Sequence, residues 1–203
     1  HRTHGAALFA DISGFTPLTE TLLKEFGPRR GPEELTRQLN LIYDALVSEV
    51  HRYKGSVIAL SGDAITCWLD GDNGLRAVAC GLAMQQAMNQ FVTLKTPSGS
   101  IISLAMKVAV ATGPVRRFLV GNPEIQYIDV LAGATLDRMV AAEHQANKGE
   151  VVISYEVINQ IGNCLELSEL RHDHGQSFAV VSQITPQAQA EVELTPWPTL
   201  ADD

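Results

Sequence analysis

The sequence of 203 residues lacks the features that mark several large classes of protein. It has no basic excess, because 15 lysines and arginines stand against 23 aspartates and glutamates, for a formal net charge of −8. This balance argues against a general attraction to nucleic acid or anionic lipid. No apolar run reaches the roughly 20 residues of a membrane-spanning helix, and the first residues lack the basic-then-apolar pattern of a secretion signal. We therefore expect a cytoplasmic protein with no nucleic-acid partner and no membrane span.

Cysteine is also scarce, and its three positions are Cys67, Cys80 and Cys164. An odd number without C-x-x-C spacing predicts neither a disulfide framework nor a zinc site, and it indicates a reducing compartment. The absence of a G-x-x-x-x-G-K-[ST] loop excludes the common ATPase route to nucleotide binding. What is present is an ordinary globular composition, 45% hydrophobic and 19% charged, in a chain long enough for one domain. Because the chain begins with His1, we expect it to be a segment of a longer polypeptide.

Apolar periodicity and turn residues predict an alternation of strands and helices. A buried strand is expected at 6–12, then a helix at 16–25, a break over 27–32 that contains two Gly-Pro pairs, and a second helix from about residue 33 to 50. The remaining expected elements are a hairpin of strands at 57–60 and 64–69, a helix at 75–91, strands at 101–112 and 115–120 joined at Gly113-Pro114, a strand at 125–131, a helix at 134–145, a strand at 150–154, a helix at 156–161, and strands at 165–170 and 178–184.

This order predicts an α+β fold, a ferredoxin-like βαββαβ-type sheet with helices on one face. Residues 1–184 are expected to form the domain. Residues 185–203 contain three prolines and little periodicity, so they are expected to be a tail or linker.

Two acids occupy corresponding places in this order. Asp11 ends the first strand, in "ALFADISGFT", and Asp63 lies at the turn of the following hairpin. In a ferredoxin-like sheet the first strand lies beside that hairpin, so the two carboxylates can meet. Each acid alone is more typical of a helix cap or a turn. Paired carboxylates at the end of a sheet, however, are how proteins hold Mg²⁺ while substrate phosphates complete its ligand set.

The residues after Asp11 are suited to the same task. They lead directly into a helix, whose free backbone N–H groups and positive end favour phosphate. These expected phosphate-binding residues are Ser13, Gly14, Phe15 and Thr16.

The stretches "FADISGFT" and "GSVIALSGDAITCW" resemble the two metal-binding motifs of class III nucleotidyl cyclases, and the resemblance runs from about Gly5 to Ile184. The chain looks most like the first catalytic domain of soluble, bicarbonate-responsive adenylyl cyclases. The resemblance implies conversion of ATP, less typically GTP, into the 3′,5′-cyclic nucleotide and pyrophosphate. It also implies an active site formed only where two such domains meet head to tail, in one polypeptide or in a homodimer.

What the family implies for single residues is specific. Asp11 and Asp63 would hold two Mg²⁺ or Mn²⁺ ions, with the Ile12 carbonyl as a further ligand. These ions would activate the ribose 3′-hydroxyl and bind the triphosphate. The likeness to bicarbonate-responsive enzymes also suggests bicarbonate or another small anion as a partner.

The sequence departs from the family at the residues that read the base. The lysine that adenylyl cyclases carry four residues before the second metal aspartate is replaced by Ala59, which has no hydrogen-bonding side chain. The other base-reading position is Val130 if Gly133 anchors the register, or Asp129 if the register moves by one.

A second departure concerns the asparagine and arginine that stabilise the transition state. Their places are taken by Asp137 and Ala141, or by Leu136 and Val140 in the alternative register. We therefore expect the metal-binding half of a two-domain cyclase that is weak or inactive alone. The alternatives are a catalytically silent regulatory domain that binds a nucleotide or small anion, and a purely structural dimerisation module.

Overall fold

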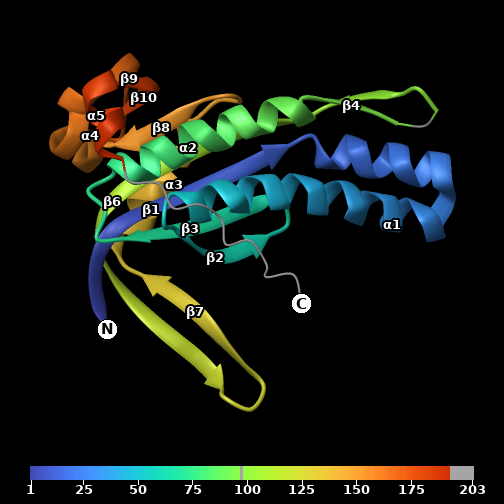
Figure 1. Ribbon diagram of the computed structural model, residues 1–203, viewed down its shortest axis with the longest axis horizontal. Helices are drawn as coiled ribbons and strands as arrows, with labels where there is room; N and C mark the ends of the chain where they lie inside the picture. Colours follow the sequence, from blue (N-terminus) through green and yellow to red (C-terminus); the bar gives the residue numbers. More distant parts are fainter. Residues whose placement is uncertain (97, 193–203) are drawn as a thin grey trace.

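The structure is a computed structural model that describes residues 1–96 and 98–192 (Figure 1). Its strands are β1 (Arg2–Ser13), β2 (Ser56–Ser61), β3 (Ala64–Asp70), β4 (Thr93–Lys95), β5 (Ile101–Ser103), β6 (Ala105–Asn122), β7 (Gln126–Ala132), β8 (Val151–Ser154), β9 (Leu165–Asp173) and β10 (Gln176–Ile184). Its α-helices are α1 (Phe15–Arg52), α2 (Leu75–Met88), α3 (Ala134–His144), α4 (Tyr155–Ile161) and α5 (Pro186–Glu191).

The main sheet has eight strands, seven of them in the order β2-β3-β1-β6-β8-β10-β9, while β7 pairs with the outer part of β6. The pairings are antiparallel except for β6 with β8. The elements β1, α1, β2, β3, α2 and β6 form a βαββαβ unit in which β1 lies between β3 and β6. The expected ferredoxin-like α+β fold is thus confirmed, and β1 is central because its run from Ala6 to Ala10 is apolar on both faces.

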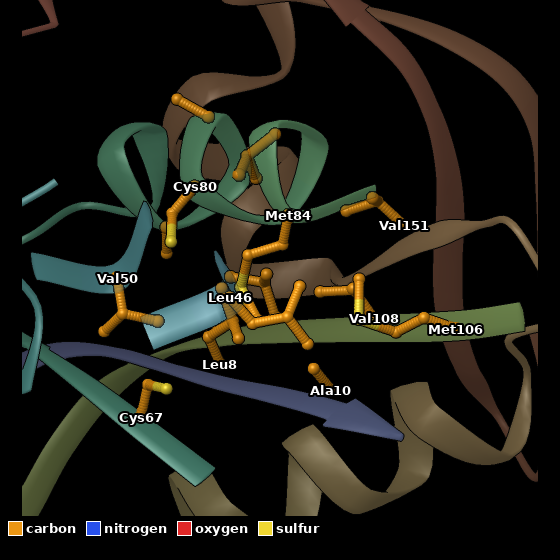
Figure 2. Packing of buried hydrophobic residues seen from close by; sticks show 14 of the residues in the cluster. Leu8, Ala10, Leu46, Val50, Cys67, Cys80, Met84, Met106, Val108 and Val151 are labelled. Carbon is orange, nitrogen blue, oxygen red and sulfur yellow. The ribbon is translucent and has the colours of Figure 1, made fainter. Parts of the chain in front are cut away.

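The main core lies between the sheet and α1 and α2. Leu8 and Ala10 of β1 point to this side and pack with Leu46 of α1, Met84 of α2 and Val108 of β6 (Figure 2). All five are completely buried. Burial of this size is the main stabilising contribution to the fold.

The alternate residues of β1 face the other side of the sheet, where α3 packs. Ala7 forms a smaller cluster there with Trp68, Val115 and Met139. The structure therefore differs from the expectation of helices on one face, because α3 covers part of the second face. Period-2 alternation in β1 explains why the second face also has a core, since each strand sends half of its side chains to each face.

The turn expected at Gly113-Pro114 is absent. Gly113-Pro114 lies inside the single strand β6. On the side of β6 away from β1, the pairing with β8 ends at Val110 and the pairing with β7 begins at Arg116, so Pro114 interrupts no hydrogen bond on that side.

The break in α1 is also narrower than expected. Gly27 alone has non-helical angles, with φ 75° and ψ −179°, and the second helical segment begins at Pro28. It does not begin at Glu33, because proline is well accommodated in the first turn of a helix.

Part of the segment expected to be a tail is structured. Pro186–Glu191 forms α5, and Ala188 and Val192 are buried in the main core. Residues 193–203 lie outside the described part of the chain, so the boundary at residue 185 stays a prediction.

Candidate active site

The pairing of β1 with β3 brings the two predicted acids to one end of the sheet. Asp11 lies opposite Ala64 in the register, and the Ile12 N–H donates a hydrogen bond of 3.0 Å to the Asp63 carbonyl. The Asp11 side chain is 27% exposed, and Asp63 is exposed in the turn between β2 and β3. Both carboxylates are thus accessible from solvent at neighbouring backbone positions.

The loop after Asp11 presents backbone donors beside these acids. Gly14 adopts a left-handed conformation with φ 106° and precedes the first turn of α1, which has no side-chain cap. The first N–H groups of a helix have no acceptor within it, and Pro17 has none to offer. The free donors of this turn therefore belong to Phe15 and Thr16, while the Ser13 hydroxyl donates to the Ala105 carbonyl at 3.2 Å.

The donor chemistry at this end of the sheet fits a hard divalent cation. Two carboxylates and the Ile12 carbonyl offer only oxygen, which Mg²⁺ and Mn²⁺ prefer. Within residues 1–96 and 98–192, no group of three or more His, Cys, Asp or Glu side chains could enclose a metal ion. The residues therefore suit an ion that takes its other ligands from phosphate or water.

A lysine and a glutamate that the motifs did not indicate lie beside Asp11. Lys107 stands opposite Asp11 in the β1–β6 register, and its Nζ is 3.5 Å from Asp11 Oδ2. The same Nζ forms a closer ion pair with Glu143 Oε1 on the last turn of α3. The hydrogen bond and the charge of Glu143 raise the pKa of Lys107 above its ordinary value, so the ammonium is charged at neutral pH. The only sign of these ion pairs in the sequence was a single charged residue, Lys107, within the apolar stretch "LAMKVAVA".

The candidate base-reading residues lie on the edge strands. Ala59 is exposed on β2. On β7, Asp129 accepts from Arg117 through both oxygens, at 3.0 and 2.8 Å from Arg117 Nε, and this contact raises the pKa of the guanidinium. Val130 follows it and is 38% exposed. Of these three candidate base-reading residues, only Asp129 has a polar side chain, and that side chain already accepts hydrogen bonds from Arg117.

The candidate transition-state positions lie on α3. Asp137 is exposed and Ala141 packs against a small apolar cluster. Arg138 donates through Nη2 to the Thr112 carbonyl and to the Thr135 hydroxyl, both at 3.0 Å. Its Nε lies 3.2 Å from Glu156. The side chain of Arg138 is thus held in place by two hydrogen bonds and an ion pair within this chain.

In the part of the chain that the structure describes, no helix combines the length and the apolar character needed to cross a membrane.

Comparison with known proteins identifies a family. The family model described as "Adenylate and Guanylate cyclase catalytic domain" matches residues 3–192. Adenylate cyclase type 10 of Rattus norvegicus is 26% identical over 98% of this chain, and that of Homo sapiens is 26% identical over 74%. The chain spans only 12% of the rat protein and 9% of the human one.

Solved structures share the fold. The guanylyl cyclase Cya2 superimposes with a TM-score of 0.75 at 22% identity, over 92% of this chain and 95% of that one. The adenylyl cyclase CyaB from P. aeruginosa gives 0.71 at 20% identity, over 92% and 97%. The guanylate cyclase domain of RhGC from Catenaria anguillulae, in complex with GTP, gives 0.70 at 17% identity, over 91% and 100%.

Proposed function

The chain belongs to the family of adenylate and guanylate cyclase catalytic domains, and from this we propose that it is the metal-binding half of a two-domain active site. The substrate we propose is ATP rather than GTP, and the products are the 3′,5′-cyclic nucleotide and pyrophosphate. The names of the curated relatives, adenylate cyclases, support this choice. We further propose a cytoplasmic role in cyclic-nucleotide signalling.

The observation that carries the proposal is that Asp11 and Asp63 lie at neighbouring backbone positions at one end of the sheet. The hydrogen bond from the Ile12 N–H to the Asp63 carbonyl fixes the β2–β3 turn beside the end of β1. Two carboxylates that belong to separate motifs then face solvent at one end of the sheet.

Each residue has a distinct role in this proposal. Asp11, Asp63 and the Ile12 carbonyl hold two ions of Mg²⁺ or Mn²⁺. When bound, these ions supply activation of the ribose 3′-hydroxyl and neutralisation of charge on the triphosphate. The N–H groups of Phe15 and Thr16, at the positive end of α1, bind phosphate oxygens, with Gly14 giving the chain its sharp entry into the helix.

A second cyclase domain is part of the proposal, from the same polypeptide or from a second copy. Asp137 and Ala141 offer no amide or guanidinium to the developing negative charge. Loss of one such donor costs about 10² to 10³ in rate. A partner domain must therefore supply these groups, and this chain alone is expected to be weak or inactive.

The test is cyclic-nucleotide formation by this chain and by its longer polypeptide, with Mg²⁺ or Mn²⁺ and with ATP or GTP. We expect activity on ATP in the longer polypeptide, and a loss of at least about 10²-fold in Asp63→Ala. Asp44→Ala, at an exposed position on α1, is the matched control and should keep its activity. Full activity in Asp63→Ala would contradict the metal-binding role.

A second candidate function is a catalytically silent regulatory domain that binds a nucleotide or a small anion such as bicarbonate. It is favoured by the contact of Asp129 with Arg117, which leaves no free polar side chain at the three base-reading positions. Tight nucleotide or bicarbonate binding without turnover, even in the longer polypeptide, would favour this candidate. A structural dimerisation module would instead tolerate the loss of both Asp11 and Asp63.

A further inference from the structure

Lys107 is the charged residue that the β1–β6 register places directly across from Asp11. It lies in an apolar part of β6, between Met106 and Val108, both of which are buried in the main core. Its own side chain points to the second face of the sheet and is 26% exposed. The position is therefore partly shielded from water, where charge interactions are stronger than at a free surface.

Two carboxylates share this one ammonium group. Lys107 Nζ is 3.5 Å from Asp11 Oδ2, and it is closer still to Glu143 Oε1. Glu143 is 16% exposed, and its other oxygen lies 3.6 Å from His144 Nε2 at the end of α3. Glu143 is thus the closer of the two partners of Lys107 and Asp11 is the more distant one.

We propose that Lys107 and Glu143 are a positioning pair that sets the affinity of Asp11 for its divalent cation. Without metal, Lys107 neutralises and orients the Asp11 carboxylate. When a cation binds Asp11, repulsion weakens the Lys107 contact, and Glu143 keeps the ammonium in place. The inference rests on the proposed metal-binding function, which it extends to two residues outside the metal-binding motifs.

The two residues must then act in opposite directions. Without Lys107 the cation has no competitor at Asp11, and the charge of Glu143 adds a further attraction, so metal binding tightens. Without the charge of Glu143, Asp11 becomes the only carboxylate partner of Lys107, so competition strengthens and metal binding weakens. A pair that served only to hold α3 against β6 would weaken binding in both cases, because either change would disturb the site.

The test is a titration of the 203-residue chain with Mn²⁺ alone, followed by the loss of the paramagnetic resonance signal of free Mn²⁺. We expect Lys107→Met to tighten Mn²⁺ binding, and Glu143→Gln to weaken it, each by about three- to tenfold. A change in affinity of this size lies between the small effect of an exposed ion pair and the larger effect of a buried one. The double variant should bind more tightly than the unchanged chain, and less tightly than Lys107→Met.

Matched controls separate this local effect from the change in net charge. Lys24→Met and Glu124→Gln alter exposed residues on α1 and in the β6–β7 turn, and neither should shift the affinity. Circular dichroism of each variant checks that it is folded. Asp11→Asn should abolish Mn²⁺ binding in this assay.

The outcomes separate the two proposals. If the unchanged chain and Asp11→Asn bind Mn²⁺ equally, the proposed metal-binding function fails. If Asp11→Asn loses binding but the Lys107 and Glu143 variants shift it in the same direction or not at all, the metal site stands and the positioning pair is overturned.

Discussion

At the scale of single residues, Gly14 is the position where the proposed phosphate loop tolerates least change. A Cβ there would lie 2.5 Å from the Ser103 carbonyl oxygen and 2.7 Å from a Leu104 methyl group, at a φ of 106°. Both the backbone strain and the overlap oppose a side chain. We expect Gly14→Ala to lower the free energy of unfolding by about 3 kcal/mol, measured by urea denaturation.

Gly149 offers the matched control for this substitution. Its φ of 87° is also left-handed, but a Cβ there would meet nothing within 4 Å. Gly149→Ala should therefore cost only the backbone strain, about 1 to 2 kcal/mol. If the two variants lose the same free energy of unfolding, the close packing of Gly14 against the β5–β6 junction does not affect stability.

Single residues also show where the sequence was informative about the site. The placement of Asp11 and Asp63 at one end of the sheet could be predicted, because a lone acid after an apolar run is visible in the chain and both belong to recognisable motifs. Lys107 and Glu143 could not, since they meet only after α3 folds back across β6. The engagement of Asp129 by Arg117 likewise depends on the β6–β7 register, which places Arg117 opposite Leu131 and Asp129 opposite Leu119.

At the scale of elements, an ion pair joins the start of β8 to the neighbouring hairpin. Arg171 of β9 donates to both oxygens of Glu150, at 2.6 and 2.8 Å, and this contact lowers the pKa of Glu150 from 4.5 to about 2. A lowered carboxyl pKa stabilises the folded state above pH 4.5, and this contribution is lost as the pH falls towards 2. We expect Glu150→Gln to be less stable at neutral pH and to show a flatter acid dependence of its unfolding free energy.

Urea unfolding at several pH values between 2 and 7 measures this effect. Glu124→Gln is the control, because Glu124 is exposed in the β6–β7 turn. An unchanged acid dependence in Glu150→Gln would mean that the Arg171 contact contributes nothing to stability in solution.

The order of the elements could be predicted largely from apolar periodicity, but two of their limits could not. Gly113-Pro114 has the composition of a turn, yet it continues β6, because its neighbours leave that stretch unpaired on one side. Pro28 has the composition of a break, yet it begins a helical segment. In both places the local preference is compatible with two structures, and the surrounding sheet or helix decides between them.

At the scale of the whole molecule, the outer part of β6 and β7 extends away from the sheet as an arm (Figure 1). One face of this arm is a strip of four apolar side chains from cross-strand pairs, with exposed fractions of 38 to 56%. They are Phe118, Val120, Ile128 and Val130. An exposed strip of this kind is typical of a surface that a partner covers, and the proposed second cyclase domain is the partner we expect.

The arm therefore gives a prediction about assembly that is separate from the chemistry of the site. We expect Val120→Thr with Ile128→Thr, which keeps the β-branched shape, to weaken association with a second cyclase domain supplied as a separate polypeptide. Loss of apolar burial at two side chains should raise the domain concentration for half-maximal activity by about tenfold or more. Activity at saturating concentration should stay unchanged, because neither residue belongs to the proposed metal or phosphate site. Leu119→Thr, on the other face of the arm, is the control, and an equal effect there would mean that the strip does not face the partner.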